Sequence, residues 1–434
     1  MTRSDNTSAG RLLRAFYVAA LVLCILLRAL YVVMSDASSL YTQWSTARDA
    51  EVYDRFGWNL AVHGTLGVGN QPSGFAMPAY PLFLAAIYRV AGHLPGAARW
   101  IQILLGVVTI VALGQFARIL GGPRARALAV AIGAVYPFFI YFTGEILTET
   151  LFLAAFSGMI LTAARLGERG RLLDGVFHGL CLALAFLTRP VGLFLEPAAL
   201  ILARPWSPVN RRSRLAGLGI GFLLFGLAWG GWIARNRSAL GETVLLDTHS
   251  GMALYLGHLE SIGVSQEEIG HRLWYGHRDI ARGTLPGGPA GELEANRRAG
   301  ELARQSIRAD PGRFLRSVAR NIARIWLHLD FSEVGSPTGT VGLATFVGWA
   351  SYAPVLFLAG AGLVRLRRLR SHAFTAILAL FATSSLIHGI FIGGQRYRVG
   401  TVDPLLIVLA AVALDEWLGR FPRIRRLTGA ENPS

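Results

Sequence analysis

The chain contains about ten apolar stretches that are long enough, or nearly long enough, to cross a lipid bilayer, since a spanning helix needs about 20 mostly apolar residues. The stretches are 15–34, 99–120, 127–142, 147–164, 174–188, 190–203, 215–234, 341–364, 373–392 and 401–418. Thr188-Arg189-Pro190 interrupts the run from 174 to 203. Proline disfavours helix at the preceding residue, so we expect a hairpin broken there. The pattern predicts an all-α polytopic membrane protein.

The composition favours a membrane protein over a soluble one. Of 434 residues, 53% are hydrophobic and 16% are charged, whereas soluble domains carry roughly a quarter charged residues. The formal net charge is +16, and every Lys+Arg residue is arginine. In a membrane protein such an excess marks cytoplasmic loops rather than a nucleic-acid partner. Both cysteines, Cys24 and Cys181, lie within apolar stretches, which argues against a disulfide framework or a cysteine metal site.

Arginine clusters fall in every second connection between the apolar stretches. They are Arg11/Arg14, Arg124/Arg126, Arg165/Arg169/Arg171, Arg204/Arg211/Arg212/Arg214, Arg365/Arg367/Arg368/Arg370 and Arg420/Arg423/Arg425/Arg426. Because positively charged loops stay in the cytoplasm, both termini are predicted to be cytoplasmic and the first stretch to be an uncleaved span. We therefore expect three parts: an N-terminal membrane module (1–234), an extracytoplasmic subdomain (235–340), and C-terminal membrane helices with a basic tail (341–434).

Two long connections, 35–98 and 235–340, then lie outside the cytoplasm. In the first, five residues of DAEVYDRFGWNLAVHG recur at helical spacing: Asp49, Tyr53, Phe56, Leu60 and His63. This spacing predicts an amphipathic helix at the membrane surface, and a second surface helix is expected at 77–92, beginning at Pro81. In the second connection, the segments 290–308 and 311–328 have helical periodicity, which predicts a small helical subdomain.

Asp49 and Asp54 are candidate catalytic acids in the first surface helix. Asp49 opens the helix at the boundary between water and membrane, where a carboxylate can accept a proton from a substrate hydroxyl. The alternative is structural, because aspartate often caps a helix and favours its positive end.

Glu145 and Glu149 lie near the outer end of the fourth predicted span. Their spacing of four residues predicts that both lie on one helix face. A carboxylate at the bilayer centre costs about 2.5–3.5 kcal/mol, so an intramembrane glutamate is a functional candidate. An ion pair with Arg189 or Arg28 is the structural alternative.

Four arginines at separate points of the chain are predicted to face the same outer side: Arg189 in LTRP, Arg235 in WIARNR, and Arg396 and Arg398 in GGQRYR. Guanidinium groups bind phosphate bidentately and stay charged at any pH. Their convergence on one cavity would suit a lipid-linked phosphate, whereas snorkelling toward lipid headgroups is the alternative for each arginine alone.

Metal binding and nucleotide chemistry have little support. His249 and His258, with an acid, form a weak candidate for a metal site, so a divalent cation stays an open possibility and no other cofactor is indicated. The sequence has no GxxxxGK[ST] loop, no GxGxxG after a strand, no GxSxG and no HExxH. An enzyme with this sequence would need a donor that is already activated and already in the membrane.

The order of motifs resembles the GT-C type of membrane glycosyltransferase, in particular the family-39 branch that contains protein O-mannosyltransferases and the lipid A aminoarabinose transferase. The motifs are DAEVYDRFGWNLAVHG at 49–64, PAYPLFLAAIY at 78–88, YPFFIYFTGEILTETLF at 136–152, LTRP at 187–190, WIARNRSALGETVLLDTHSGMALYLG at 232–257 and RYRVGTVDPLLIVLAA at 396–411. The resemblance implies a bundle of about ten transmembrane helices with surface helices in the first outer loop.

The resemblance also implies a function. Members of that family transfer a sugar from a polyprenyl-phosphate carrier to an acceptor, usually with inversion. Here the acceptor would be a hydroxyl or an amine on a lipid, protein or glycan at the outer face of the bacterial cytoplasmic membrane. By position, Asp49 would be the general base, Glu149 the acid at the head of the fourth span, and Arg235 and the Arg396-Tyr397 pair would lie near the donor phosphate.

The substrate is expected to contact a further set of residues. These are Tyr53, Tyr80, Glu145, His249 and Tyr397. A Glu-Lys-type pair of the aminoarabinose branch is replaced here by Ala76-Met77, which argues against that branch's metal site and phosphate-binding lysine.

Two other functions fit parts of the pattern. A transporter or flippase of polyprenyl-linked lipids would also use an outer cavity lined by arginine, although transporters commonly show paired broken helices and lack large one-sided loops. A lipid-binding scaffold without activity is the third possibility, and Asp49 and Glu149 argue mildly against it.

Overall fold

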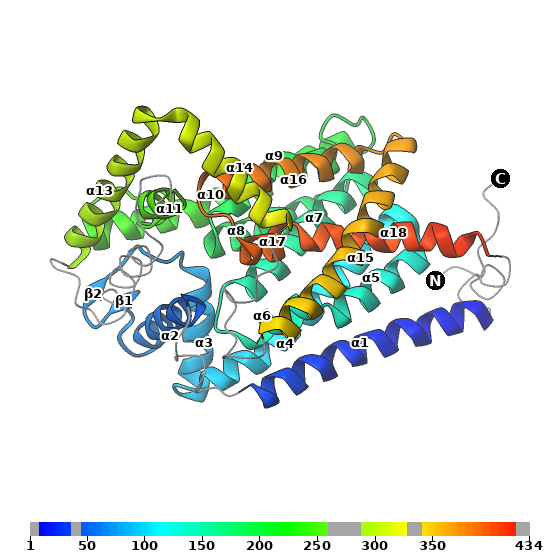
Figure 1. Ribbon diagram of the computed structural model, residues 1–434, viewed down its shortest axis with the longest axis horizontal. Coiled ribbons are helices and arrows are strands. Elements are labelled where there is room, and N and C mark those ends of the chain that lie inside the picture. The colour runs from blue at the N-terminus through cyan, green and yellow to red at the C-terminus, as the bar shows by residue number, and fades with distance from the viewer. Residues whose placement is uncertain (1–7, 36–44, 259–287, 328–340, 422–434) are drawn as a thin grey trace.

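The computed structural model describes residues 8–35, 45–258, 288–327 and 341–421 (Figure 1). Within these residues, the chain forms 17 helices and one small hairpin. The predictions for the basic tail after Phe421, and for 259–287 and 328–340 of the second outer connection, lie outside the described residues. The all-α fold is confirmed.

Helices make up nearly all of the described chain, and the two short strands lie between the second and third helices. In chain order, the elements are α1 (Ser8–Met34), α2 (Ser45–His63), β1 (Gly67–Val68), β2 (Gln71–Pro72), α3 (Ala79–Ala91), α4 (Pro95–Gly121), α5 (Pro123–Val135), α6 (Pro137–Gly144), α7 (Glu149–Arg169), α8 (Leu172–Thr188), α9 (Val191–Ala203), α10 (Arg211–Leu240), α11 (Ser250–Leu256), α13 (Gly288–Ala309), α14 (Pro311–Leu327), α15 (Val341–Arg368), α16 (His372–Ile390), α17 (Gln395–Thr401) and α18 (Asp403–Gly419). The two strands pair antiparallel, with Gly67 opposite Pro72 and Val68 opposite Gln71.

Six of the described helices are long and apolar enough to cross a membrane: α1, α4, α7, α10, α15 and α16. Two bent pairs raise the number to eight if each pair is one span, α5 with α6 at 55° and α17 with α18 at 59°. The ten predicted stretches correspond to these eight units together with α8 and α9, which are apolar but shorter. The first bend has a local cause, because Tyr136 is extended ahead of Pro137. The predicted break is confirmed, since α8 ends at Thr188 and α9 begins at Val191.

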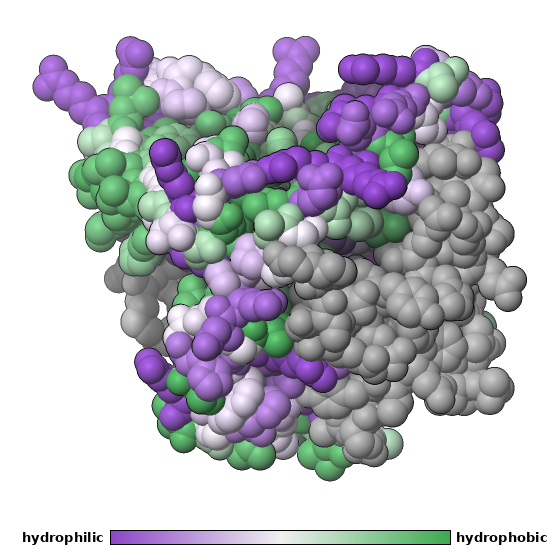
Figure 2. Space-filling model, turned by 90° about the vertical axis from the view of Figure 1, so that its left-hand side faces the viewer, coloured by the Kyte–Doolittle hydropathy of each residue, from purple (hydrophilic) through white to green (hydrophobic). Residues whose placement is uncertain are grey.

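The direction of the chain alternates along the bundle. The arginine-rich connections therefore lie together at the end where α1 begins and α18 ends (Figure 1). The opposite end carries α2, α3, the hairpin, α11 and α13, and we call it the loop end. Figure 2 shows the loop end from outside, with hydrophilic side chains gathered across its upper part. The protein is an integral membrane protein with its long connections at one end.

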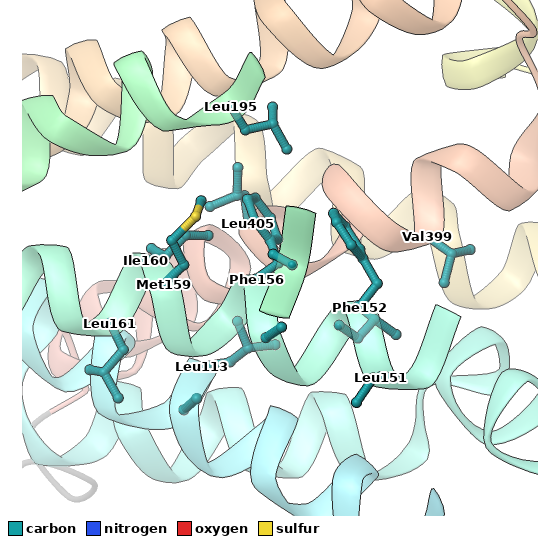
Figure 3. Close-up of a cluster of buried hydrophobic side chains, with 14 of the residues drawn as sticks. Leu113, Leu151, Phe152, Phe156, Met159, Ile160, Leu161, Leu195, Val399 and Leu405 are labelled. Atoms are coloured by element: carbon teal, nitrogen blue, oxygen red, sulfur yellow. The ribbon is translucent and has the colours of Figure 1, made fainter. Parts of the chain in front are cut away.

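Helix α7 lies at the centre of the bundle. Between its charged ends, the sequence ETLFLAAFSGMILTAARLGER is apolar on all sides, as expected for a helix that is enclosed by others. Buried α7 residues such as Phe152, Phe156 and Met159 pack with Leu113 of α4 and Leu405 of α18 (Figure 3). The first residue of this fixed helix is Glu149, so its carboxylate is held in place by the core.

Helices α8 and α10 approach each other through glycine. A Cβ on Gly179 would lie 2.1 Å from the carbonyl oxygen of Gly221, and one on Gly175 would lie 2.4 Å from the carbonyl carbon of Gly217. Small residues spaced four apart allow this backbone contact between membrane helices. The contact fixes α8, whose last turn leads into Arg189.

The loop end contains the surface helices that the sequence predicts. Helix α3 begins at Ala79 after Pro78 rather than at Pro81. Pro81 falls in the first helical turn, where its missing N–H costs nothing. The predicted helices at 290–308 and 311–328 are α13 and α14. Glu292 of α13 accepts hydrogen bonds from Ser73 Oγ (2.7 Å) and the Gly74 N–H (2.9 Å), so α13 is joined to the first outer connection.

Candidate active site

Four charged residues from distant parts of the sequence meet beside the start of α7. Asp49 comes from α2, Glu149 from α7, Arg189 from the break between α8 and α9, and Arg396 from α17. We call these four residues the charged cluster. Two carboxylates and two guanidinium groups give it a net charge of zero.

Arg396 lies at the centre of the charged cluster. Its Nε and Nη1 donate to Glu149 Oε1 and Asp49 Oδ2, and its Nη2 lies 3.4 Å from Glu149 Oε2. Arg189 donates from Nη1 to Glu149 Oε1 at 3.1 Å. One guanidinium thus bridges both candidate acids.

The two carboxylates differ in their access to solvent. The side chain of Glu149 is fully buried between two arginines, whereas that of Asp49 is 24% exposed. A buried carboxylate with two cationic partners is a fixed counter-ion. Asp49 is therefore the acid of the cluster that a second molecule can reach, and Glu149 holds the arginines in position.

Tyrosine rings form the wall around the charged cluster. Tyr53 and Tyr80 pack edge to face with ring centroids 5.3 Å apart, and Tyr80 donates a hydrogen bond to Gln102 Oε1 (2.8 Å). The pKa of Tyr53 is raised above its usual value, mainly by burial and to a smaller extent by the nearby Asp49 carboxylate. The Tyr53 hydroxyl therefore stays protonated. Tyr397 lies on the other side, with its ring centroid 5.3 Å from Arg189 Cζ. Tyr53, Tyr80 and Tyr397 thus all lie beside the charged cluster, and their contact with a substrate stays a prediction.

Glu145 is not on the same helix face as Glu149, and that prediction was wrong. Helix α6 ends at Gly144, Glu145 is extended, and α7 begins only at Glu149. Arg99 Nε donates to the Gly144 carbonyl at 2.7 Å and helps to hold this break. Tyr31 donates to Glu145 Oε1 (3.3 Å), and burial raises the pKa of Glu145 to about 7.

Asp54 lies outside the charged cluster. Its carboxylate is buried and accepts hydrogen bonds from Tyr88 Oη (2.5 Å) and His93 Nε2 (2.9 Å). His93 in turn stacks on Trp58 at 4.8 Å between ring centroids. These contacts join α2 to α3, so the structure gives Asp54 a role in the pairing of the two surface helices rather than in the site.

Two of the predicted phosphate-binding arginines also lie elsewhere. Arg235 donates from Nη1 to the Ser73 carbonyl and from Nη2 to the Leu66 carbonyl, both at 2.7 Å, and so holds the hairpin loop. Arg398 is fully buried, with Nε 2.9 Å from Asp403 Oδ1. Its Cζ lies 3.8 Å from the ring centroid of Tyr352 and 5.0 Å from that of Phe138. Of the four arginines, Arg189 and Arg396 lie in the charged cluster.

The histidines proposed for a metal site are separated. The His249 ring packs against Phe75 at 4.7 Å, whereas His258 bonds to Ser317 Oγ (2.9 Å) and the Ile390 carbonyl (2.6 Å). In the described ranges, no group of three or more His, Cys, Asp or Glu side chains is arranged to hold a metal ion.

The sequence analysis missed His388 of α16. Its ring lies 4.8 Å from that of Tyr397 and is buried. A signal was available, because a histidine within an apolar span (FATSSLIHGIF) is a functional candidate on the same grounds as an intramembrane glutamate.

Comparison with known proteins identifies the architecture. The family model described as dolichyl-phosphate-mannose-protein mannosyltransferase matches residues 71–230. The archaeal oligosaccharyltransferase AglB from Archaeoglobus fulgidus, in complex with an inhibitory peptide and a dolichol-phosphate, superimposes with a TM-score of 0.55 at 14% identity, covering 96% of this chain and 52% of that one. The chain has the GT-C fold.

Other solved structures show how much of a similar protein this chain covers. The apo form of the Archaeoglobus fulgidus enzyme gives a TM-score of 0.55 at 14% identity, over 96% of this chain and 53% of that one. The GT-C chain described here thus spans about half the length of those enzymes. ArnT from Cupriavidus metallidurans, bound to undecaprenyl phosphate, gives a TM-score of 0.40 at 14% identity, over 93% of this chain and 78% of that one, an overlap too weak to support a conclusion. No curated protein sequence matches the chain significantly.

Proposed function

We propose that this protein is a membrane glycosyltransferase that moves a sugar from a polyprenyl-phosphate carrier to an acceptor at the outer face of the bacterial cytoplasmic membrane. The observation that carries the proposal is the bridge from Arg396 to Asp49 and Glu149. A carboxylate that a second molecule can reach lies beside a guanidinium, and transfer from a phosphate-linked donor can use the first as a base and the second to bind phosphate. The loop end would be the outer face and both termini would be cytoplasmic.

In the proposed reaction, Asp49 accepts the proton of the acceptor hydroxyl or amine as that atom attacks the anomeric carbon. The bond between the anomeric carbon and the phosphate oxygen breaks on the opposite side, so the configuration inverts. Arg396 and Arg189 stabilise the negative charge of the departing polyprenyl phosphate. A dolichol-phosphate is bound in the AglB structure of the same fold, which supports a lipid phosphate as the carrier here.

The contacts of Arg396 suggest how the base is released. Arg396 donates to Asp49 and Glu149 together. A donor phosphate that takes over the bonds to Asp49 frees this carboxylate for the acceptor, while Glu149 and Arg189 keep Arg396 in place. Binding of donor would then precede productive binding of acceptor.

The test is a transfer assay with the full-length protein in lipid nanodiscs. Polyprenyl phosphates carrying radiolabelled mannose, glucose or arabinose are incubated with membrane extract as the acceptor source, and label in the carrier and in products is measured. Transfer by the wild type and its loss in D49N support the proposal. No sugar release from any of the three donors, or wild-type turnover by D49N, contradicts it.

A transporter or flippase of polyprenyl-linked lipids is the second candidate function. The two bent helix pairs α5/α6 and α17/α18 favour it. The two functions differ in bond cleavage. In proteoliposomes, a transporter moves labelled lipid between leaflets with the sugar still attached, whereas a transferase releases the sugar from its carrier.

A further inference from the structure

His388 differs in hydrogen bonding from His178 and His258, the two other histidines of the described chain that are buried as whole residues. Both ring nitrogens of His178 have partners, the Met159 carbonyl at 3.1 Å and Glu196 Oε1 at 2.8 Å. The two nitrogens of His258 are also paired. His388 is 7% exposed, and its Nε2 is buried with no hydrogen-bond partner among the described residues.

An unpaired buried nitrogen is costly in this place. Burying a polar group without a partner costs free energy, and polar groups within membrane spans are usually paired or functional. Side-chain contacts on both sides of His388 keep α16 from turning to relieve the cost. Ser384, one turn earlier, is hydrogen-bonded to Thr401 of α17, and a Cβ on Gly389 would lie 2.8 Å from Ile322. His388 is therefore held where it is.

A chain of contacts links His388 to the charged cluster. Its ring packs on Tyr397 at 4.8 Å, Tyr397 lies 5.3 Å from Arg189 Cζ, and Arg189 bonds to Glu149. Arg189 also interacts electrostatically with His388. The imidazole thus lies beside the cluster, behind an aromatic ring, rather than between the two arginines that suit a phosphate.

We propose that His388 and Tyr397 bind the sugar of the polyprenyl-phosphate donor, with His388 hydrogen-bonding a sugar hydroxyl and the Tyr397 ring packing against the sugar face. An aromatic surface with one or two convergent polar groups is the usual construction of a small-ligand pocket. The ligand chemistry is that of a neutral polyhydroxy ring, next to an anionic group held by Arg189 and Arg396. This inference rests on the proposed glycosyl transfer and names a residue that selects the sugar.

The test compares two affinities of the same protein. Binding of undecaprenyl phosphate, which carries no sugar, and of polyprenyl phosphates bearing mannose, glucose or arabinose is measured in nanodiscs by scintillation proximity. The wild type is expected to bind at least one sugar-bearing carrier more tightly than undecaprenyl phosphate. H388A is expected to lose about three- to tenfold of that affinity, which corresponds to one hydrogen bond, with no change for undecaprenyl phosphate.

Two variants separate a sugar contact from a structural effect. H388Q keeps a polar group near the position of Nε2 and is expected to recover part of the lost affinity. S384A alters a buried polar side chain on the same face of α16 and is expected to keep the wild-type affinity ratio. The affinity for undecaprenyl phosphate reports folding in every variant, because it depends on the arginines.

Three outcomes would overturn the inference: a wild type that binds all three sugar-bearing carriers no more tightly than undecaprenyl phosphate, an H388A variant with the wild-type ratio, or an equal loss for both kinds of carrier. Because these are binding measurements, they do not depend on turnover. A failed transfer assay with an intact affinity ratio would contradict the proposed function and leave the sugar contact supported.

Discussion

Arg396→Ala is the most informative single change, because Arg396 pairs with two different carboxylates. Glu149 is the buried counter-ion, and Asp49 is the proposed base. Removal of Arg396 leaves fully buried Glu149 with Arg189 as its remaining ionic partner at 3.1 Å, while the partly exposed Asp49 can be solvated. Breaking a buried ion pair by removing one partner costs about 3–5 kcal/mol. We expect the lower end, about 3 kcal/mol, since the second arginine remains. Thermal unfolding in detergent should show a Tm lower by several degrees.

A second substitution separates the two roles of Arg396. In R396A/E149Q the buried negative charge is also removed, so stability should recover by about 1–3 kcal/mol relative to R396A, as for residues in direct contact. Sugar transfer should stay abolished, because the donor phosphate still lacks Arg396. R420A is a matched control, since its pair with Glu416 is exposed and exposed pairs contribute little.

The reasoning would be refuted by two results. If R396A/E149Q is no more stable than R396A, Glu149 is not the group that needs the arginine. If the double variant regains transfer, Arg396 acts through stability alone and does not bind the donor phosphate.

D49N should bind donor normally but lower kcat by about 10²–10⁴, the usual contribution of a general base; a single-turnover assay measures this, and an unchanged kcat contradicts the role. Because Glu145 has a pKa of about 7 in the folded protein against an ordinary 4.5, the folded state retains a proton that the unfolded state has released. The free energy of unfolding should then fall as pH rises from 4.5 to about 7, with E145Q losing this dependence in unfolding scans. Gly179→Ala should destabilise the protein by about 1–3 kcal/mol through overlap with α10, whereas Gly230→Ala, with open space around it, should be nearly neutral by Tm.

The membrane helices could be predicted because their signal is local. A helix in lipid satisfies its own backbone hydrogen bonds, so about 20 apolar residues identify it without knowledge of its neighbours. The errors came where a local signal was given too little weight. Tyr136-Pro137 disfavours helix before the proline, and the run from 127 to 142 is indeed bent there. Glu145 and Glu149 were assigned to one helix because the apolar run around them hid the break between α6 and α7.

The candidate site could not be assembled from the sequence, because its residues are far apart along the chain. Asp49 and Arg396 are separated by 347 residues. Motif order could indicate both residues, but their contact depends on how α2, α7 and α17 pack. The motif indicated both Arg396 and Arg398 as site residues, but helical geometry allows only one of them to face the site. Residues two apart on a helix point about 200° apart, so both could not face one cavity. Helical geometry alone would have excluded one of the two.

Which arginine remains could not be decided from the sequence near α17 by itself. Asp403, at the start of α18, pairs with Arg398 inside the bundle, whereas Glu149 and Asp49 pair with Arg396 across it. Arg235 could not be assigned in this way at all. Its acceptors are the backbone carbonyls of Leu66 and Ser73, and every residue has a carbonyl, so no residue type marks such a partner. An arginine that binds backbone carbonyls and one that pairs with carboxylates in a candidate site cannot be told apart in the sequence, and only the fold distinguishes them.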